Sequence, residues 1–281
     1  MSDDTECGQE LDCARGDSGS GESFLHKPVA SASVLGQPLG PGILLVDKPA
    51  GISSARVVDV VRRVTGIKRT GHGGTLDPFA TGLLPVLVGR EFTREADDLL
   101  AGDKEYLLTI RFGSETDTCD LTGAVVARGA SPLPDAATIR SALEAFVGVL
   151  QQEAPAYSAL KHQGKPLYWY ARRGEPVIKP PRVVRIDSAE LIEWLAPDAV
   201  VRVACGKGAY MRSLARDLGR VLGCCGHLVA LRRTVVGPFR VEQATPLWHL
   251  ERRATAPRLP ATRLDVPKAC VVRSDESEGT G

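Results

Sequence analysis

The chain has 281 residues, a formal net charge of +1 and a hydrophobic fraction of 43%, which together predict a globular protein with a substantial core. No apolar run reaches the length of a transmembrane helix, and the first thirty residues contain neither a hydrophobic signal segment nor an Arg-rich transit sequence. We therefore expect a soluble, cytoplasmic protein.

The first part of the chain changes from a polar segment to patterned hydrophobicity. Residues 1–41 are rich in glycine, serine and acidic side chains, which predicts a disordered acidic tail. The apolar run at 42–46 predicts a buried strand. Ser53 or Ser54 can cap the following helix, in which valines recur at helical spacing. A glycine-rich loop then occupies residues 71–78.

The middle of the chain mixes strand and helix patterns. An apolar run covers 83–88, and loose alternation at 106–112 predicts a strand whose candidate partner is 124–127. Helical spacing follows at 135–148. Residues 151–181 contain five prolines together with cations and aromatics, which predicts a long functional loop around a short helix.

The last patterned part of the chain ends near Phe239, and residues 269–281 are expected to form a frayed tail. The pattern here predicts strands at 183–195, 200–205 and 229–236, and an amphipathic helix at 210–222. Helices and strands are interleaved irregularly rather than as a regular βαβ alternation. This order favours an α+β domain built on a mixed or antiparallel sheet.

The charges are unevenly distributed. Residues 1–40 carry seven acidic and two basic side chains. Residues 161–185 carry seven basic side chains and one acidic, and residues 202–240 carry eight basic side chains and one acidic. Such basic blocks suit phosphate contacts, but a solvated cationic surface explains them equally well.

Asp77 is the first candidate for chemistry. Pro78 restricts the backbone of the residue before it, and a carboxylate held at a fixed angle suits a nucleophile or a general base. An isolated Asp-Pro pair, however, is usually an ordinary turn. The nearby glycines match neither a dinucleotide fingerprint nor a P-loop, so no nucleotide cofactor is expected. Seven cysteines without a Cys-x-x-Cys pair make a zinc site or a disulfide framework unexpected.

A wider set of motifs gives Asp77 a context. They occur in order at 47–54, 71–85 (beginning GHGGTLDP), 104–106, 157–161, 164–168, 171–172, 205–215 and 231–233. Each block is weak alone, but the ordered set resembles the TruB family of tRNA pseudouridine synthases. The resemblance implies an α+β pseudouridine synthase fold, with a central mixed sheet flanked by helices and an RNA-binding cleft. It also implies isomerisation of the T-loop uridine at tRNA position 55.

The resemblance assigns roles to individual residues. Asp77 matches the family's catalytic aspartate, Arg212 the arginine that pairs with it, and Tyr106 the tyrosine that stacks on a flipped base. The reaction oxidises nothing and transfers no external group, so no cofactor is expected. The remaining matches are RNA-binding or pocket residues, and they are Lys48, His72, Tyr210, Leu231, Lys161, Lys165, Arg172 and Arg173.

The resemblance also suggests a domain organisation. Residues 42–240 would form the catalytic domain, with a thumb loop at about 151–181 that clamps the RNA arm. Residues 241–281 would form a short C-terminal remnant rather than the family's complete C-terminal RNA-binding domain. Ala209 stands where the family usually has threonine, so a hydroxyl is missing beside Tyr210.

Three functions remain open from the sequence. The first is a tRNA uridine isomerase that acts on the T-arm as a monomer without guide RNA. The second is a non-catalytic RNA-binding or RNA-folding protein on the same scaffold. The third is a guide-dependent synthase of the same superfamily. The intact set of Asp77, Tyr106 and Arg212 favours the first.

Overall fold

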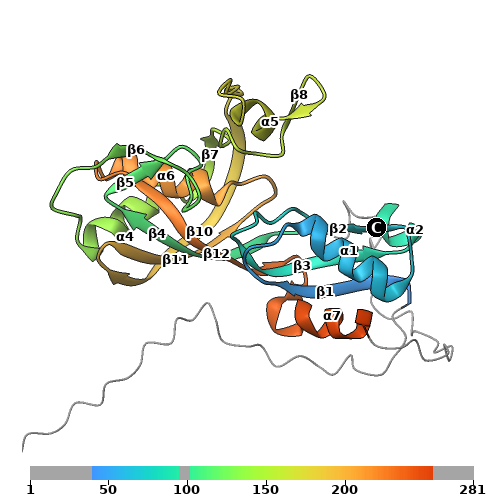
Figure 1. Ribbon diagram of the computed structural model, residues 1–281. Coiled ribbons are helices and arrows are strands. Elements are labelled where there is room, and N and C mark those ends of the chain that lie inside the picture. Colours follow the sequence, from blue (N-terminus) through green and yellow to red (C-terminus); the bar gives the residue numbers. More distant parts are fainter. Residues whose placement is uncertain (1–39, 95–101, 256–281) are drawn as a thin grey trace, which may run out of the picture.

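The computed structural model describes residues 40–94 and 102–255 (Figure 1). The acidic tail expected for residues 1–41 lies outside these ranges except for its last two residues, and the frayed tail expected at 269–281 lies wholly outside them. Within the described ranges, no helix is long and apolar enough to cross a membrane.

A mixed ten-stranded sheet forms the centre of the molecule. Its main path runs β14-β1-β3-β12-β4-β11-β10-β7, while β2 pairs with β3 and β13 pairs with β12. The β1–β14 and β3–β12 pairs are parallel and the others are antiparallel. The strands are β1 (Gly42–Lys48), β2 (Thr70–His72), β3 (Thr81–Val88), β4 (Lys104–Phe112), β7 (Gly148–Gln152), β10 (Arg182–Leu195), β11 (Asp198–Cys205), β12 (Gly226–Val236), β13 (Phe239–Arg240) and β14 (Thr245–Pro246).

Helices pack beside this sheet, and the α+β fold class predicted from the sequence is confirmed (Figure 1). Helix α6 packs on β12 and β4, α4 packs on β10, and α7 packs on α1 and β1. The helices are α1 (Ser54–Thr65), α2 (Arg90–Arg94), α4 (Ala136–Glu144), α5 (Leu167–Ala171), α6 (Met211–Val221) and α7 (Leu247–Thr255), with a 3₁₀ turn η2 (Val241–Gln243).

The ends of α1 follow from local chemistry. The Ser53 hydroxyl accepts a hydrogen bond from the Arg56 backbone N–H at 3.2 Å, which satisfies one of the free donors of the first turn. Gly66 ends the helix in the left-handed region at φ 73°, where glycine is favoured. Val57, Val60 and Val61 of the apolar stripe are buried in the main core, and Val64 is partly buried against it. The capped helix therefore presents a fixed N-terminal turn to the loop that contains Asp77.

One strand pairing differs from the sequence prediction. The sequence predicts residues 124–127 as the partner of 106–112, but β6 (Val125–Arg128) pairs with β5 (Ser114–Thr116) in a separate two-stranded sheet. Strand β4 instead lies between β11 and β12, which offer it much longer ladders. The chain leaves the sheet at Gly113, which has φ 97° and donates its N–H to the Cys224 carbonyl.

Residues 151–181, which we call the thumb segment, project beyond the body of the sheet in Figure 1. They contain a small hairpin of β8 (Lys161–His162) and β9 (Lys165–Pro166), followed by the short helix α5. Leu167 and Ala171 are the buried residues of α5, whereas most of the segment's cations are exposed. The short helix within a long connection is the arrangement that the sequence predicted.

Residues 241–255 are joined to the central sheet. Strand β14 extends the sheet beside β1, and α7 packs on α1 and β1. Val241 and Ala244 belong to a small second core with Leu83, Leu87 and Val236. This part of the expected C-terminal remnant therefore packs together with the central sheet.

Candidate active site

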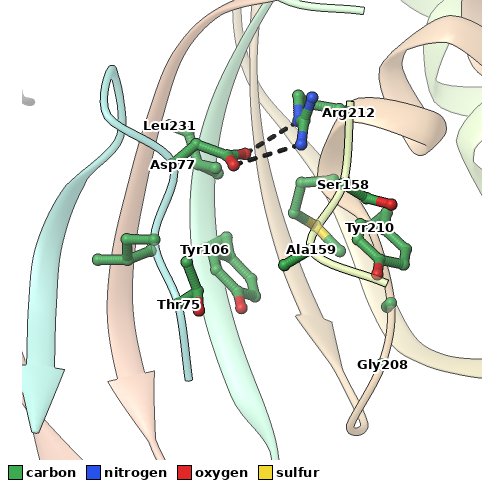
Figure 2. Close-up of a pocket in the computed structure, with 12 residues that line it drawn as sticks. Thr75, Asp77, Tyr106, Ser158, Ala159, Gly208, Tyr210, Arg212 and Leu231 are labelled. Carbon is green, nitrogen blue, oxygen red and sulfur yellow. Dashed lines mark hydrogen bonds and ion pairs between the residues drawn. The ribbon is translucent and has the colours of Figure 1, made fainter. Parts of the chain in front are cut away.

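A cavity of about 270 Å³ opens where five segments of the chain meet. The segments are the loop before β3, the strands β4 and β12, the start of α6, and the base of the thumb segment. The cavity is lined by Thr75, Leu76, Asp77, Tyr106, Ser158, Ala159, Gly208, Ala209, Tyr210, Met211, Arg212 and Leu231. Four of the residues predicted from the sequence, Tyr106, Tyr210, Arg212 and Leu231, thus surround Asp77 (Figure 2).

The backbone around Asp77 is held by buried hydrogen bonds. The Ser54 hydroxyl accepts from the Leu76 N–H at 2.9 Å and donates to the Leu76 carbonyl at 3.0 Å. On the other side, the Ala80 N–H donates to the Asp77 carbonyl at 3.1 Å. Because both flanks are tied to the fold, the position of the carboxylate is set before any substrate arrives.

Lys48 holds the loop that contains Asp77 through hydrogen bonds to its backbone. It is fully buried, and its Nζ donates to the carbonyls of Pro49 at 2.9 Å, Pro78 at 3.2 Å and Ala80 at 2.5 Å. Burial lowers the pKa of Lys48 to about 8, while the charge of Asp77 opposes this shift. Its expected place among the RNA-binding residues does not fit this position, because Lys48 is fully buried and lines neither of the two cavities found in this region. Its position agrees instead with support of the pocket floor.

Arg212 fixes the direction of the Asp77 carboxylate. Its Nε lies 2.9 Å from Oδ2 and its Nη2 lies 3.3 Å from Oδ1, a two-point contact that a planar guanidinium makes well (Figure 2). The guanidinium also donates to the carbonyls of Thr118 at 3.1 Å and Tyr157 at 2.8 Å. The Arg212 side chain is only 6% exposed, so these partners determine its orientation.

A second carboxylate lies beside this pair. Asp120 Oδ2 is 3.5 Å from Arg212 Nη1, and its side chain is 5% exposed. Its other oxygen accepts from the Thr118 hydroxyl and from the N–H and hydroxyl of Thr122, at 2.8, 2.9 and 2.5 Å. Two carboxylates therefore share one guanidinium.

The pKa of Asp77 reflects these opposing influences. Burial raises the pKa above its ordinary value of 3.8, the charge of Arg212 lowers it, and the charge of Asp120 raises it again. The Asp77 side chain remains 34% exposed, and Asp77 lines the cavity. The site therefore holds a poorly hydrated carboxylate that is accessible from the cavity, which is the environment of a reactive group.

The walls of the cavity are mainly apolar and aromatic. Tyr106 on β4 and Leu231 on β12 are buried, with 8% and 7% of their surface exposed. Tyr210 lies at the start of α6, where its backbone N–H and carbonyl are both hydrogen-bonded to the buried Gln152 side chain, at 2.7 and 3.1 Å. Burial raises the pKa of both tyrosines, so their hydroxyls stay neutral. A planar base can stack against such walls.

The other predicted RNA-binding residues lie outside this cavity. His72 lines a second cavity next to it. The four thumb cations predicted to bind RNA are exposed, and three of them lie over aromatic rings: Lys165 and Arg173 over Trp169, at 3.7 and 4.7 Å from the ring centroid, and Arg172 over Tyr168 at 5.4 Å. The fourth is Lys161. Among the described residues, no group of His, Cys, Asp and Glu could hold a metal ion.

Sequence reasoning missed three residues of this region. Asp120 gives no signal because an acidic residue in a Thr-rich turn is common. Ser158 lies inside one of the motifs, but only the structure shows that its buried hydroxyl lines the cavity without a hydrogen-bond partner among the described residues. Arg233 counts in the sequence as one more basic residue, yet it is 1% exposed.

Comparison with known proteins agrees with this geometry. The model of the TruB family pseudouridylate synthase N-terminal domain matches residues 62–211, and that of the tRNA pseudouridylate synthase B C-terminal domain matches residues 212–260. The boundary between the two matches falls within the first turn of α6, so it does not coincide with a boundary of the fold.

Curated relatives match over most of their length. The chain is 49% identical over 214 residues to tRNA pseudouridine synthase B of Bordetella avium, covering 75% of this chain and 87% of the relative. It is also 49% identical over 213 residues to the protein of that name from Desulfotalea psychrophila, covering 74% of this chain and 87% of the relative.

Solved structures show a similar fold. A Cbf5–Nop10–Gar1 complex contains a chain with a TM-score of 0.57 and 28% identity, matched over 76% of this chain and 59% of its own. An H/ACA RNP bound to a substrate RNA containing 2′-deoxyuridine gives a TM-score of 0.55 at 26% identity, covering 74% of this chain and 51% of its own. This chain thus spans about half to three-fifths of these structures. From the family models and the curated relatives, the chain belongs to the TruB family of pseudouridylate synthases.

Proposed function

We propose that this chain is a tRNA pseudouridine synthase that isomerises the T-loop uridine at position 55, with Asp77 as its nucleophile. The observation that carries the proposal is the two-point contact between Asp77 and Arg212 at a cavity walled by Tyr106 and Leu231. The names of the curated relatives support a tRNA substrate. The catalytic unit would be residues 42–240, with the thumb segment as its RNA clamp.

The chemistry needs only what the cavity provides. The N1–C1′ glycosidic bond breaks, the uracil rotates, and C5 bonds to C1′. The C5 proton then leaves and N1 ends with a proton, so no atom is gained or lost. An ionised Asp77 can attack C1′, add to the base, or remove a sugar proton on a glycal route, and on the first route its charge balances the cationic character that develops at C1′.

The uridine has to leave its stack to reach Asp77. Unpaired bases that are turned out of RNA are usually held by stacking on aromatic side chains. Tyr106 would provide the stacking face, and Leu231 and Tyr210 would close the remaining sides of the cavity (Figure 2). Excluding water from this space would strengthen the interaction between Asp77 and the reacting sugar.

The direct test is to incubate the full-length protein with a T-arm transcript and map pseudouridine at single-nucleotide resolution. We expect one product site, at the uridine corresponding to position 55, with no guide RNA or second protein added. A transcript with cytidine at that position should give none. Binding without any product would favour the non-catalytic RNA-binding function, and product only with guide RNA would favour the guide-dependent one. We expect the active species to be a monomer in sedimentation experiments.

A further inference from the structure

A second cavity, of about 280 Å³, adjoins the Asp77 cavity. The two share Thr75, Tyr106, Gly208 and Ala209 as a common wall. We call the second one the Arg233 cavity. Lys104, Lys207, Arg233 and His72 supply its basic side chains, and no carboxylate is among the described residues that line it.

Arg233 is the most unusual of these residues. It is 1% exposed, and its guanidinium donates to the carbonyls of Leu83 at 2.8 Å and Gly74 at 3.1 Å. Within the described chain no carboxylate pairs with it, whereas its neighbour Arg232 is bound at two points by Asp47, at 3.0 and 2.8 Å. A buried cation without a counter-ion is unfavourable, so the cavity favours an anionic ligand.

The positive charge of Arg233 also acts on two other basic groups that line the cavity, His72 and Lys104. Burial and then the charge of Arg233 lower the pKa values of His72 and Lys104. The Nδ1 atom of His72 is buried without a hydrogen-bond partner among the described residues. An anion placed among these groups would relieve their mutual repulsion, and it would accept a hydrogen bond from His72 Nδ1 in the tautomer that is protonated there.

Glycines make the backbone accessible at this cavity. Gly74 and Gly208 have φ of 88° and 95°, which glycine adopts easily, and both are exposed. A Cβ at Gly208 would meet no atom within 4 Å, so the space in front of it is open. An extended RNA strand can therefore pass close to the protein backbone between the two cavities.

We propose that the Arg233 cavity binds a phosphodiester group of the RNA strand, next to the nucleotide whose base enters the Asp77 cavity. This inference rests on the proposed function, since it names the part of that substrate which the second cavity holds. Because the two cavities share a wall, a nucleotide in one of them can place its neighbouring phosphate in the other. A guanidinium and an ammonium are the groups that most often hold RNA phosphates. The interaction would fix the strand so that the everted uridine stays in place.

The test combines a change in the RNA with a change in the protein. T-arm RNAs carry a neutral methylphosphonate at the phosphate 5′ or 3′ of the target uridine, one at a time. Their dissociation constants are measured with full-length Asp77→Asn protein, which avoids turnover, and with the same protein also carrying Lys104→Gln. Lys104 is chosen over Arg233 because its Nζ donates to the carbonyl of Gly102, two residues away, whereas Arg233 joins two carbonyls distant in the chain.

We expect each single change to weaken binding about tenfold, as for the removal of one charge-assisted hydrogen bond. For one of the two flanking phosphates, the combined change should cost little more than either alone, because both remove the same interaction. Lys161→Gln makes the same charge change on the exposed thumb segment. Its fold-change in the dissociation constant should instead multiply with that of the methylphosphonate, at either of the two phosphates. If the fold-changes caused by Lys104→Gln and by the methylphosphonate multiply at both phosphates, the proposal is overturned.

Two further measurements distinguish a bound phosphodiester from a free anion and from an empty cavity. If the methylphosphonates do not weaken binding to the protein with native Lys104, the proposal fails whatever the variant does. If inorganic phosphate raises the melting temperature only when Lys104 is present, while the RNA experiment shows no coupling, the cavity takes free anions and the proposal also fails. Product mapping with wild-type protein is independent of these binding constants, so a failure of the proposed isomerase activity is recognised separately.

Discussion

The two basic stretches of the chain look alike in sequence but differ in the structure. Residues 161–185 have seven cations against one acidic residue, and residues 202–240 have eight against one. In the first stretch the thumb cations are exposed and several lie over aromatic rings. In the second stretch most arginines are buried, and Arg212 and Arg232 are held at two points by carboxylates that are themselves buried or half-buried.

The difference shows that local charge does not by itself identify a binding surface. Exposed cations are screened by salt and contribute little to the free energy of folding. Because the fold does not depend on them, they are free to contact a polyanion such as RNA. Buried arginines have lost their hydration and depend on specific partners, so they fix the geometry of other groups. We expect changes in the thumb to affect mainly RNA affinity, and changes in the inner stretch to affect mainly catalysis.

After replacement of Asp77 itself, the largest effect should come from Arg212→Lys. Lysine keeps the charge but cannot make the two-point contact with Asp77 and also reach the Thr118 and Tyr157 carbonyls. We expect kcat to fall by on the order of 100- to 1,000-fold, which is typical when one preorganised electrostatic interaction is removed. Steady-state assays at saturating T-arm RNA measure it. Arg202→Lys, an exposed arginine of the same stretch paired with Glu190, is the control and should stay within about twofold of wild type.

Asp120→Asn should have a smaller effect on the same machinery. Asparagine can keep the acceptor for the Thr118 and Thr122 donors, but it removes the negative charge beside Arg212. We expect kcat to fall on the order of tenfold, as for other groups that orient a catalytic side chain. The acid limb of the pH profile should move to lower pH, because the charge of Asp120 raises the pKa of Asp77. Asp117→Asn, on the exposed side of the same turn, should change neither quantity.

Neutralising the thumb should separate affinity from catalysis. The variant replaces four exposed cations with glutamine, namely Lys161, Lys165, Arg172 and Arg173. We expect KM to rise strongly while kcat at saturating RNA stays within about twofold of wild type. The dependence of log KM on log salt should flatten by roughly 0.7 to 0.9 for each phosphate that the thumb no longer neutralises.

The control for the thumb variant is glutamine at Arg128 and Arg140, two exposed arginines outside the thumb segment. It should leave both KM and its salt dependence unchanged. An equal weakening in the control would mean that overall charge, and not the thumb, attracts the RNA. A fall in kcat without a change in KM would contradict the division between the two stretches.

The smallest and most specific effect should appear in the pH dependence of activity and of melting temperature of the wild-type protein. Burial raises the pKa of Asp77 above 3.8, so the active carboxylate is lost as the pH falls through a midpoint above that value. The same shift acts in the opposite direction on folding. Because the fold disfavours the charged form, protonation of Asp77 relieves a destabilising contribution as the pH falls. The kcat/KM profile of the wild type, and its melting-temperature profile compared with that of Asp77→Asn, would show the two opposite trends, and an acid limb below 3.8 would contradict them.

Much of this structure follows from local sequence patterns. The valine periodicity after Ser53 predicts α1, and the alternation at 106–112 predicts β4. The predicted pairing of 124–127 is wrong, because strand partners depend on long-range interactions that alternation within one segment does not encode. The motif order places Asp77, Tyr106 and Arg212 in one set, and the structure lines one cavity with them.

Other features of the site could not be predicted because they depend on burial. The sequence distinguishes Arg212 from Arg202 only through a motif, and it gives no sign that Arg233 is buried against backbone carbonyls. A lysine such as Lys48 is usually exposed and so suggests RNA binding, whereas here three carbonyls satisfy its ammonium group inside the fold.

The most direct test of the central claim compares Asp77→Asn with wild type on one T-arm RNA, measuring both the dissociation constant and the amount of pseudouridine formed. Asparagine has nearly the same shape as aspartate but lacks its charge. If Asp77 is the nucleophile, the variant should bind the RNA within a few-fold of wild type and form no detectable pseudouridine. Product formation at a rate close to that of wild type would contradict the assignment.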